Sequence, residues 1–181
     1  MITSRRTLAR RRMAFVAALA ALALAPGAAL ALLDEGRPAC DYCRMIFDQH
    51  PLCGGEILTR SGARKIYDSM ECMAAAVLTD SVPQRDIRAI ALVDHAHPTM
   101  HVPLARAVLV HCPEMETPMG LSLVAFRTRA DAQRACPSRA VRFIDWRGVL
   151  THVDTTWFKG SLDVDRHVGA QRAKPRAAAR R

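Results

Sequence analysis

The alternation of apolar and polar positions predicts two pairs of antiparallel strands in the first two thirds of the chain. Residues 56–59 and 65–67 are apolar stretches on either side of a Ser-Gly turn, and glycine supplies the positive φ that such a hairpin turn requires. Residues 87–93 and 102–110 are apolar and rich in β-branched side chains, and the segment between them is polar and contains a proline. We therefore expect two antiparallel hairpins.

Two capping patterns predict where helices begin. Asp68 and Glu71 have the spacing of a capping box, in which the first side chain accepts a backbone N–H and the second reaches back to the cap. We expect a helix from here to about residue 78. Thr128 and Asp131 repeat the pattern before a second helix, which should stop at the proline that follows Cys136.

The last third of the chain repeats this order of elements. Residues 121–126 predict a strand before the second helix, and residues 141–146 predict another after it, continuing through a turn at 147–148 into residues 149–151. In both halves an aromatic residue ends a strand, a polar cap follows and a helix begins, which is weak internal similarity. The pattern predicts an α+β fold of two small ββαβ-like units with antiparallel sheets, each carrying one short helix.

The first 31 residues have the pattern of a cleaved export signal. An arginine-rich segment containing Arg5 and Arg6 precedes an apolar run over residues 13–25, which is shorter than the roughly 20 residues of a membrane-spanning helix. A small-x-small cleavage pattern follows at residues 29–31. The paired arginines resemble a twin-arginine signal, although they also suit the Sec route. We expect a soluble periplasmic protein, because no lipobox cysteine follows the apolar run.

Positive charge is concentrated at the two ends of the chain. The formal net charge is +9, but residues 1–31 contain five arginines and residues 166–181 contain six basic side chains, without an acidic residue in either segment. The intervening residues carry 15 basic and 17 acidic groups, so nucleic-acid binding is not expected. We expect an N-terminal unit over residues 32–112, a C-terminal unit over residues 113–165 and a basic, disordered tail over residues 166–181.

A C-x-x-C-x-M motif lies near the start of the predicted mature chain. Cys40, Cys43 and Met45 place two thiols and a thioether within reach of one metal ion, and such soft ligands favour Cu(I), zinc or iron–sulfur chemistry. The methionine favours copper, because structural zinc sites use four Cys or His ligands, usually in two separated pairs. From spacing alone, a disulfide and a thioredoxin-like redox pair remain alternatives.

A second sulfur-containing stretch, Met-Glu-Thr-Pro-Met-Gly at residues 115–120, opens the predicted C-terminal unit. Met119 lies between a proline and a glycine, in a constrained loop where core packing is not its obvious role. A gap-filling core methionine remains the alternative. Met119 is therefore a candidate metal ligand.

Several motifs follow one another in a characteristic order. They are C-x-x-C-x-M, Tyr-Asp-Ser-x-x-Cys at 67–72, Asp94 before a turn, and Thr-Pro-Met-Gly at 117–120, followed by Ala-Phe at 125–126 and Asp-Ala at 131–132. Over roughly residues 38–150 this order resembles the nitrous-oxide reductase accessory protein family, NosL. Two features depart from the family pattern: Arg44 stands where glycine is usual, and the lipid-anchoring cysteine common in the family is missing.

The resemblance implies a copper-binding protein, not an enzyme, that delivers Cu(I) for assembly of the copper–sulfide centre of nitrous-oxide reductase. It implies Cys40, Cys43, Met45 and Met119 as metal ligands. The implied partners are the copper ion and nitrous-oxide reductase or its maturation machinery at the membrane, and we expect a monomer or weak dimer. A site that mixes thiolates with thioethers suits Cu(I) transfer, because methionine cannot form a disulfide and low coordination leaves a side open for the recipient.

The remaining candidate residues have structural interpretations. His97 and His101, close to Asp94, could complete a copper site but are expected to be solvated residues of a hairpin turn. Cys72 is expected to be a buried apolar residue. Three further cysteines are either free or paired, and their spacing cannot decide which: Cys53, Cys112 and Cys136.

Two other functions remain as alternatives. A periplasmic thiol–disulfide oxidoreductase would use Cys40 and Cys43 as its redox pair, but it leaves both methionines unexplained. An organomercurial-lyase-like enzyme would combine the thiol pair with a carboxylate such as Asp68, although the sequence does not place that carboxylate at the thiols.

Overall fold

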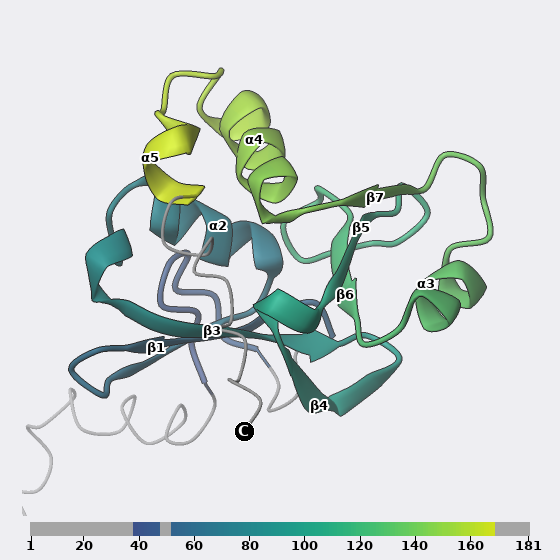
Figure 1. Ribbon diagram of the computed structural model, residues 1–181, viewed down its shortest axis with the longest axis horizontal. Coiled ribbons are helices and arrows are strands. Elements are labelled where there is room, and N and C mark those ends of the chain that lie inside the picture. Colours follow the sequence, from purple (N-terminus) through teal and green to yellow (C-terminus); the bar gives the residue numbers. More distant parts are fainter. Residues whose placement is uncertain (1–37, 48–51, 169–181) are drawn as a thin grey trace, which may run out of the picture. The chain divides into compact units, whose positions relative to one another are not determined.

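The computed structural model describes residues 38–47 and 52–168 (Figure 1). These residues all belong to one unit of the chain, Pro38–Arg181. The predicted export signal and nearly all of the predicted basic tail lie outside the described residues. None of the described helices is long and apolar enough to cross a membrane.

Two antiparallel sheets form the framework, one with the strand order β2-β1-β3-β4 and the other with the order β6-β5-β7. The strands are β1 (Gly55–Thr59), β2 (Arg64–Tyr67), β3 (Ile87–Asp94), β4 (His97–Pro103), β5 (Val108–His111), β6 (Leu123–Phe126) and β7 (Arg142–Ile144). In each sheet the first strand lies between the second and the third, and a helix connects those two: α2 (Met70–Leu78) or α3 (Arg129–Ala135). The predicted α+β fold of two ββαβ-like units is confirmed.

Strand β5 belongs by its pairing to the second sheet. It pairs with β6 and β7, although it precedes the predicted boundary between residues 112 and 113. The strand predicted over residues 102–110 is thus two strands in different sheets. Strand β4 ends at Pro103, which has no N–H to continue the ladder, and the 3₁₀ helix η3 (Leu104–Arg106) leads into β5. The three boundaries between the four predicted segments themselves stay predictions.

Helix α2 is the centre of the larger core. All nine of its residues are buried. Figure 1 shows it between the four-stranded sheet on one side and helices α4 (Trp146–Trp157) and α5 (Val164–Val168) on the other. A helix that is covered on all sides needs apolar or small residues around its whole circumference, which its sequence MECMAAAVL provides except at one glutamate. That glutamate, Glu71, has a partner described below.

The segment after β7 differs from the prediction. Residues 149–151 do not continue an extended chain but lie in α4, because Asp145 caps this helix by accepting a hydrogen bond of 2.8 Å from the N–H of Gly148. The apolar side chains on the buried face recur at i, i+3, i+4 and i+7, the spacing of a helix. They are Trp146, Val149, Leu150 and Val153.

The start of α2 also differs from the prediction. Ser69, not Asp68, is its N-cap, and the Ser69 hydroxyl accepts a hydrogen bond of 3.1 Å from the N–H of Cys72. Glu71 does not reach back to the cap, because its carboxylate bonds to Thr117 in a distant loop. The capping pattern before α3 is confirmed, since Thr128 is the N-cap there. Asp68 is therefore available for another role.

Candidate metal centre

Residues 38–47 form a closed loop that carries the C-x-x-C-x-M motif. The N–H of Cys40 donates to the carbonyl oxygen of Met45 over 2.9 Å, and the N–H of Arg44 donates to the carbonyl oxygen of Cys40 over 3.0 Å. Arg44 has a φ of 66°, in the left-handed region that favours glycine. The arginine thus adopts the turn conformation that a glycine would adopt with less strain.

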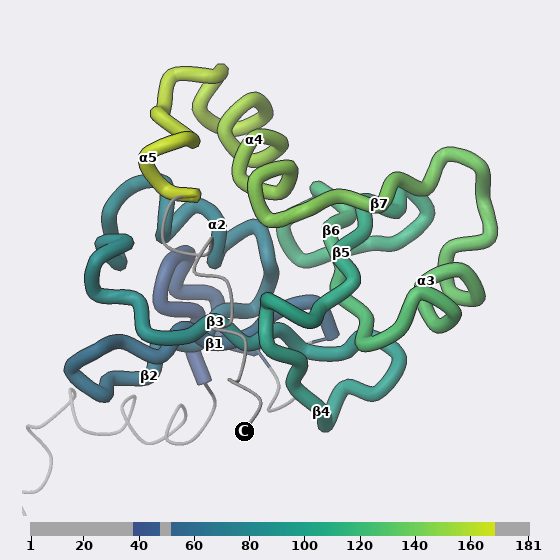
Figure 2. The backbone as a smooth tube through the Cα atoms, in the orientation of Figure 1, coloured from purple at the N-terminus to yellow at the C-terminus, as the bar shows by residue number. Residues whose placement is uncertain are grey.

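Asp41 attaches this loop, which is the purple segment of the tube in Figure 2, to strand β2. Its N–H donates to the carbonyl oxygen of Ile66 over 2.8 Å, and its carboxylate accepts from the N–H of Ile66 over 2.7 Å. The carboxylate also lies 3.2 Å from Nζ of Lys65. These contacts fix the loop beside the end of β2, where Asp68 follows Tyr67.

A glycine allows the close approach on the other side of Asp68. A Cβ atom at Gly54 would lie 2.0 Å from the carbonyl oxygen of Tyr67 and 2.8 Å from the carbonyl carbon of Asp68, so any side chain at this position would force the backbone apart. The segment that enters β1 and the segment that leaves β2 are therefore in direct backbone contact, which positions Asp68 rigidly.

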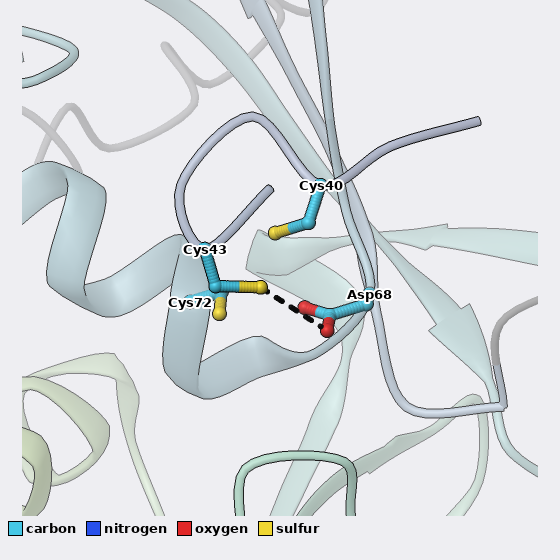
Figure 3. Close-up of side chains that lie close together, drawn as sticks. All are labelled: Cys40, Cys43, Asp68 and Cys72. Atoms are coloured by element: carbon cyan, nitrogen blue, oxygen red, sulfur yellow. Dashed lines mark hydrogen bonds between the residues drawn. The ribbon is translucent and has the colours of Figure 1, made fainter. Parts of the chain in front are cut away.

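Three thiols and one carboxylate converge at this point. The sulfur atoms of Cys40, Cys43 and Cys72 and a carboxylate oxygen of Asp68 all lie within 4.8 Å of one another. Figure 3 shows the four side chains gathered around one point. The residues come from three places: the closed loop, the end of β2 and the first turn of α2. Cys43 is half-buried, whereas the other three are buried. The cluster therefore reaches towards the surface at Cys43.

The thiols of this cluster differ in their protonation. The Cys72 thiol, by hydrogen bonding to the sulfur of Cys40, lowers the pKa of Cys40 to about 6, and backbone N–H groups, including that of Asp68, act in the same direction. The same interaction, together with burial, raises the pKa of Cys72. Burial also raises the pKa of Cys43. Of the three thiols, that of Cys40 is thus the most readily deprotonated.

The polar atoms of Asp68 complete the donor set. Its Oδ2 accepts a hydrogen bond of 3.5 Å from the Cys43 thiol. Its Oδ1 is buried and has no hydrogen-bond partner. A buried oxygen in this state destabilises the folded protein unless a further group binds to it. Three sulfur donors suit Cu(I), and four donors of Cys and Asp type are also a set that zinc accepts. The arrangement fits a soft or borderline metal ion.

A model of one protein family matches more than half of the chain. That family is NosL, and the match spans residues 33–140. The chain belongs to the NosL family. Among solved structures, the crystal structure of the copper chaperone NosL from Shewanella denitrificans is similar, with 18% sequence identity over 54% of this chain and 78% of that chain, and a TM-score of 0.47. A search of curated proteins finds no match.

The motif that resembles NosL contributes two of its three sulfur residues to the cluster. Cys40 and Cys43 are both present, but the side chain of Met45 is 48% exposed. Met119 is half-buried and packs against the core cluster that includes Cys40 and Cys72. The structure therefore puts Met119 next to the same core and Met45 at the surface, and the roles of both methionines as ligands stay predictions.

Two members of the cluster were assigned other roles from the sequence. Cys72 is buried, as expected, but its sulfur lies among the candidate ligands instead of serving only as an apolar residue. Asp68 is not the helix cap. The sequence did contain a signal for Cys72: it is the third residue of its helix, and side chains in a first turn lean towards the N-terminus of the helix, where Asp68 lies.

His97 and His101, near Asp94, are exposed, as the sequence predicts, although both lie in strand β4 and not in the turn itself. Nδ1 of His97 lies 3.1 Å from Oδ2 of the buried Asp94, at the turn between β3 and β4, and His101 is exposed. Asp94 also accepts a hydrogen bond of 3.3 Å from the N–H of Arg127. Within residues 38–47 and 52–168, the four-residue cluster is the one group of three or more Cys, His, Asp or Glu side chains that converges in this way.

Proposed function

We propose that the protein is an exported, non-enzymatic Cu(I) chaperone that supplies copper for the maturation of nitrous-oxide reductase in the periplasm. The observation that carries the proposal is the convergence of Cys40, Cys43, Cys72 and Asp68 on one largely buried point. Membership of the NosL family supports it. The orphaned Oδ1 of Asp68 adds weight, because a buried polar atom without a partner suggests that the cluster is complete only with a bound ion.

The cluster has properties that a carrier needs. Cys40, whose pKa is lowered to about 6 by its hydrogen bond with Cys72, loses its proton to a metal ion more readily than an ordinary thiol does. Cys43 is half-buried, so one side of the bound ion would be accessible to ligands of a recipient. Copper can then leave by stepwise ligand exchange and need not pass through a free ion.

The first test is an anaerobic titration of the reduced protein with Cu(I) in competition with a colorimetric chelator. We expect one tightly bound Cu(I) at this cluster, lost in Cys40→Ser/Cys43→Ser and at least tenfold weaker in Cys72→Ser. Cys53→Ala is the matched control, because Cys53 is a buried thiol of a different apolar cluster and its loss should leave this affinity unchanged. Unchanged binding in the double variant would contradict the proposal.

Two further arms refine the ligand set. Met45→Leu and Met119→Leu conserve side-chain volume, so a weaker affinity in either variant would identify a thioether ligand. A competition between Cu(I) and Zn²⁺ distinguishes a copper site from a zinc site, and retention of zinc against Cu(I) would exclude a copper carrier.

Delivery and location need separate measurements. Copper-loaded protein should transfer Cu(I) to copper-depleted nitrous-oxide reductase or to its maturation machinery, and Cys40→Ser/Cys43→Ser should not. N-terminal sequencing of protein recovered from the periplasm should begin near residue 32. Recovery of an uncut chain from the cytoplasm would contradict export.

Thiol–disulfide exchange is the second candidate, and one observation favours it: the low pKa of Cys40, which is the pKa of a nucleophilic thiolate. The same sulfur is inaccessible, since Cys40 is 0% exposed. Rapid reduction of a model disulfide substrate that depends on Cys40, combined with copper affinity that does not, would favour the redox function.

A further inference from the structure

A second group of sulfur atoms lies in the C-terminal half of the fold. Cys112 follows β5, Met115 lies in the turn after it, and Cys136 is the C-cap of α3. The Cys136 thiol lies 3.9 Å from Sδ of Met115, and it also interacts with the thiol of Cys112 through a hydrogen bond. All six cysteines of the chain are free thiols, so neither member of this pair is used in a disulfide.

The local backbone holds the three residues in place. The N–H of Met115 donates to the carbonyl oxygen of Cys112 over 2.8 Å, which closes the turn between them. The N–H of Cys136 donates to the carbonyl oxygen of Ala132 over 2.9 Å, and this hydrogen bond holds Cys136 in place as the C-cap of α3. Two thiols and a thioether are thus brought together from segments more than 20 positions apart by ordinary turn and helix hydrogen bonds.

We propose that Cys112, Met115 and Cys136 form a second binding site for Cu(I). The donor set is the same as that of the C-x-x-C-x-M motif, two thiols and one thioether, but it is assembled by the fold and does not come from a contiguous sequence. The proposal stands on this geometry alone and does not depend on the function proposed for the first cluster.

The separation of the sulfur atoms agrees with a shared metal ion. With metal–sulfur bonds of about 2.3 Å, the sulfurs of a trigonal site are about 4.0 Å apart and those of a tetrahedral site about 3.8 Å apart. The distance of 3.9 Å between Cys136 and Met115 needs no rearrangement of either side chain to meet these values.

The number and type of donors select Cu(I) over zinc. Structural zinc sites use four Cys or His ligands, and in the described part of the chain no third Cys, His, Asp or Glu side chain joins Cys112 and Cys136. Cu(I) accepts soft thioether ligands and low coordination. The surrounding side chains are apolar and would exclude water from the bound ion: Val110, Val124, Phe126, Ala132 and Phe143.

The burial of the two thiols disfavours exchange with a large disulfide partner. Burial, followed by the neighbouring Cys112 thiol, raises the pKa of Cys136 to about 12, so a metal ion that binds there must displace the thiol proton. Cys112 is 0% and Cys136 2% exposed, which further protects them from a large disulfide partner. Met115 is half-buried, so an ion would enter past its side chain.

The test uses the reduced full-length protein under anaerobic conditions, titrated with Cu(I) against a competing chelator. We expect two Cu(I) per chain in the wild type and one in Cys112→Ala/Cys136→Ala. The triple variant Cys40→Ser/Cys43→Ser/Cys72→Ser, which lacks the first cluster, should still bind one. In that triple variant Met115→Leu, which conserves volume, should weaken the remaining site at least tenfold, whereas Cys53→Ala, a buried thiol of the same apolar cluster, should not.

X-ray absorption of the copper-loaded triple variant gives a second criterion. We expect a first shell of sulfur alone, with two or three scatterers. A shell of nitrogen or oxygen would overturn the proposal, as would a wild-type stoichiometry of one that is abolished in the triple variant; the latter result leaves the first cluster intact as a copper site. A Cys112–Cys136 disulfide found by mass spectrometry of the unreduced protein, with no copper bound to this pair after reduction, would assign it a structural role instead.

Discussion

The hydroxyl of Thr117 donates a hydrogen bond of 2.6 Å to Oε1 of Glu71, joining the loop that carries Met119 to the first turn of the helix that carries Cys72. Both residues are buried, and the same hydroxyl accepts a hydrogen bond of 3.1 Å from the N–H of Ser122. The loop of the second sulfur-containing stretch and the helix that carries Cys72 are therefore connected through a carboxylate in the core.

Thr117→Val should destabilise the protein, because it keeps the shape of the side chain but removes the donor to Glu71. A buried acceptor that loses its partner costs about 1–3 kcal/mol, and here the N–H of Leu123, at 3.4 Å, is a weak replacement. Urea denaturation of the metal-free protein measures the loss. Thr156→Val is the control, because the Thr156 hydroxyl also donates a hydrogen bond, to the carbonyl oxygen of His152, but is exposed. If the control loses as much free energy of unfolding as Thr117→Val, the buried hydrogen bond has no special role.

Ser69→Ala should destabilise helix α2 by about 1 kcal/mol, because it removes the cap of the Cys72 N–H. Asp68→Asn should retain most of that stability, since Asp68 is not the cap, but it should weaken Cu(I) binding by the first cluster. Equilibrium unfolding and copper titration of both variants separate the two roles. The assignment fails if Asp68→Asn loses as much helix stability as Ser69→Ala and binds copper normally.

Gly54→Ala should be among the more damaging single substitutions outside the cluster. Its Cβ would lie 2.0 Å from a backbone oxygen, so the strands must separate, and overpacking of this kind costs about 1–3 kcal/mol or more. Since the strain falls on Asp68, copper affinity should fall as well. Gly148→Ala provides the contrast: its Cβ would meet a side-chain carbon at 3.1 Å in a helix that favours alanine, and stability should change less.

Acid should weaken the fold through His111 and His152, whose rings lie 4.8 Å apart at their centroids. Burial, then the charges of His152 and Arg142, lowers the pKa of His111, and burial together with the charge of Arg142 lowers the pKa of His152. Below the ordinary value of about 6.5 the unfolded chain therefore binds more protons than the folded one, so stability is full above this pH and falls as the pH decreases.

His152→Gln should reduce this loss between pH 6.5 and 5, as measured by denaturation at a series of pH values. His101→Gln, which changes an exposed histidine, should leave the pH dependence as it is in the wild type. Equal slopes in all three proteins would mean that the histidine pair does not contribute to acid sensitivity.

Local patterns in the sequence predicted most of the fold, because their partners are close in the chain. Thr128 and Asp131 are three residues apart, and their capping interaction forms as expected. Asp68 and Glu71 have the same spacing, but the partner of Glu71 lies 46 residues away, and nothing in the local pattern distinguishes the two situations. The helical spacing of α4, by contrast, was present in the sequence and was outweighed by the turn expected around Gly148.

The candidate site was predictable only in part for the same reason. Cys40 and Cys43 form a contiguous motif, so their proximity follows from the sequence. Cys72 and Asp68 join them through the register of β2 and the direction of side chains in the first helical turn, which require the fold. The Cys112 and Cys136 thiols meet only because α3 packs on the second sheet, and no spacing rule connects them.

The equal strand order of the two ββαβ units makes one pair of positions equivalent: Cys72 and Asp131 are both the third residue of their helix. In the second unit Asp131 forms the cap together with Thr128. In the first unit the position carries the Cys72 thiol, and Ser69 is the one capping side chain. The second unit therefore has at this position a residue that stabilises the start of its helix, and the first has a candidate ligand. The start of the first helix depends correspondingly more on Ser69 and on burial by the surrounding core.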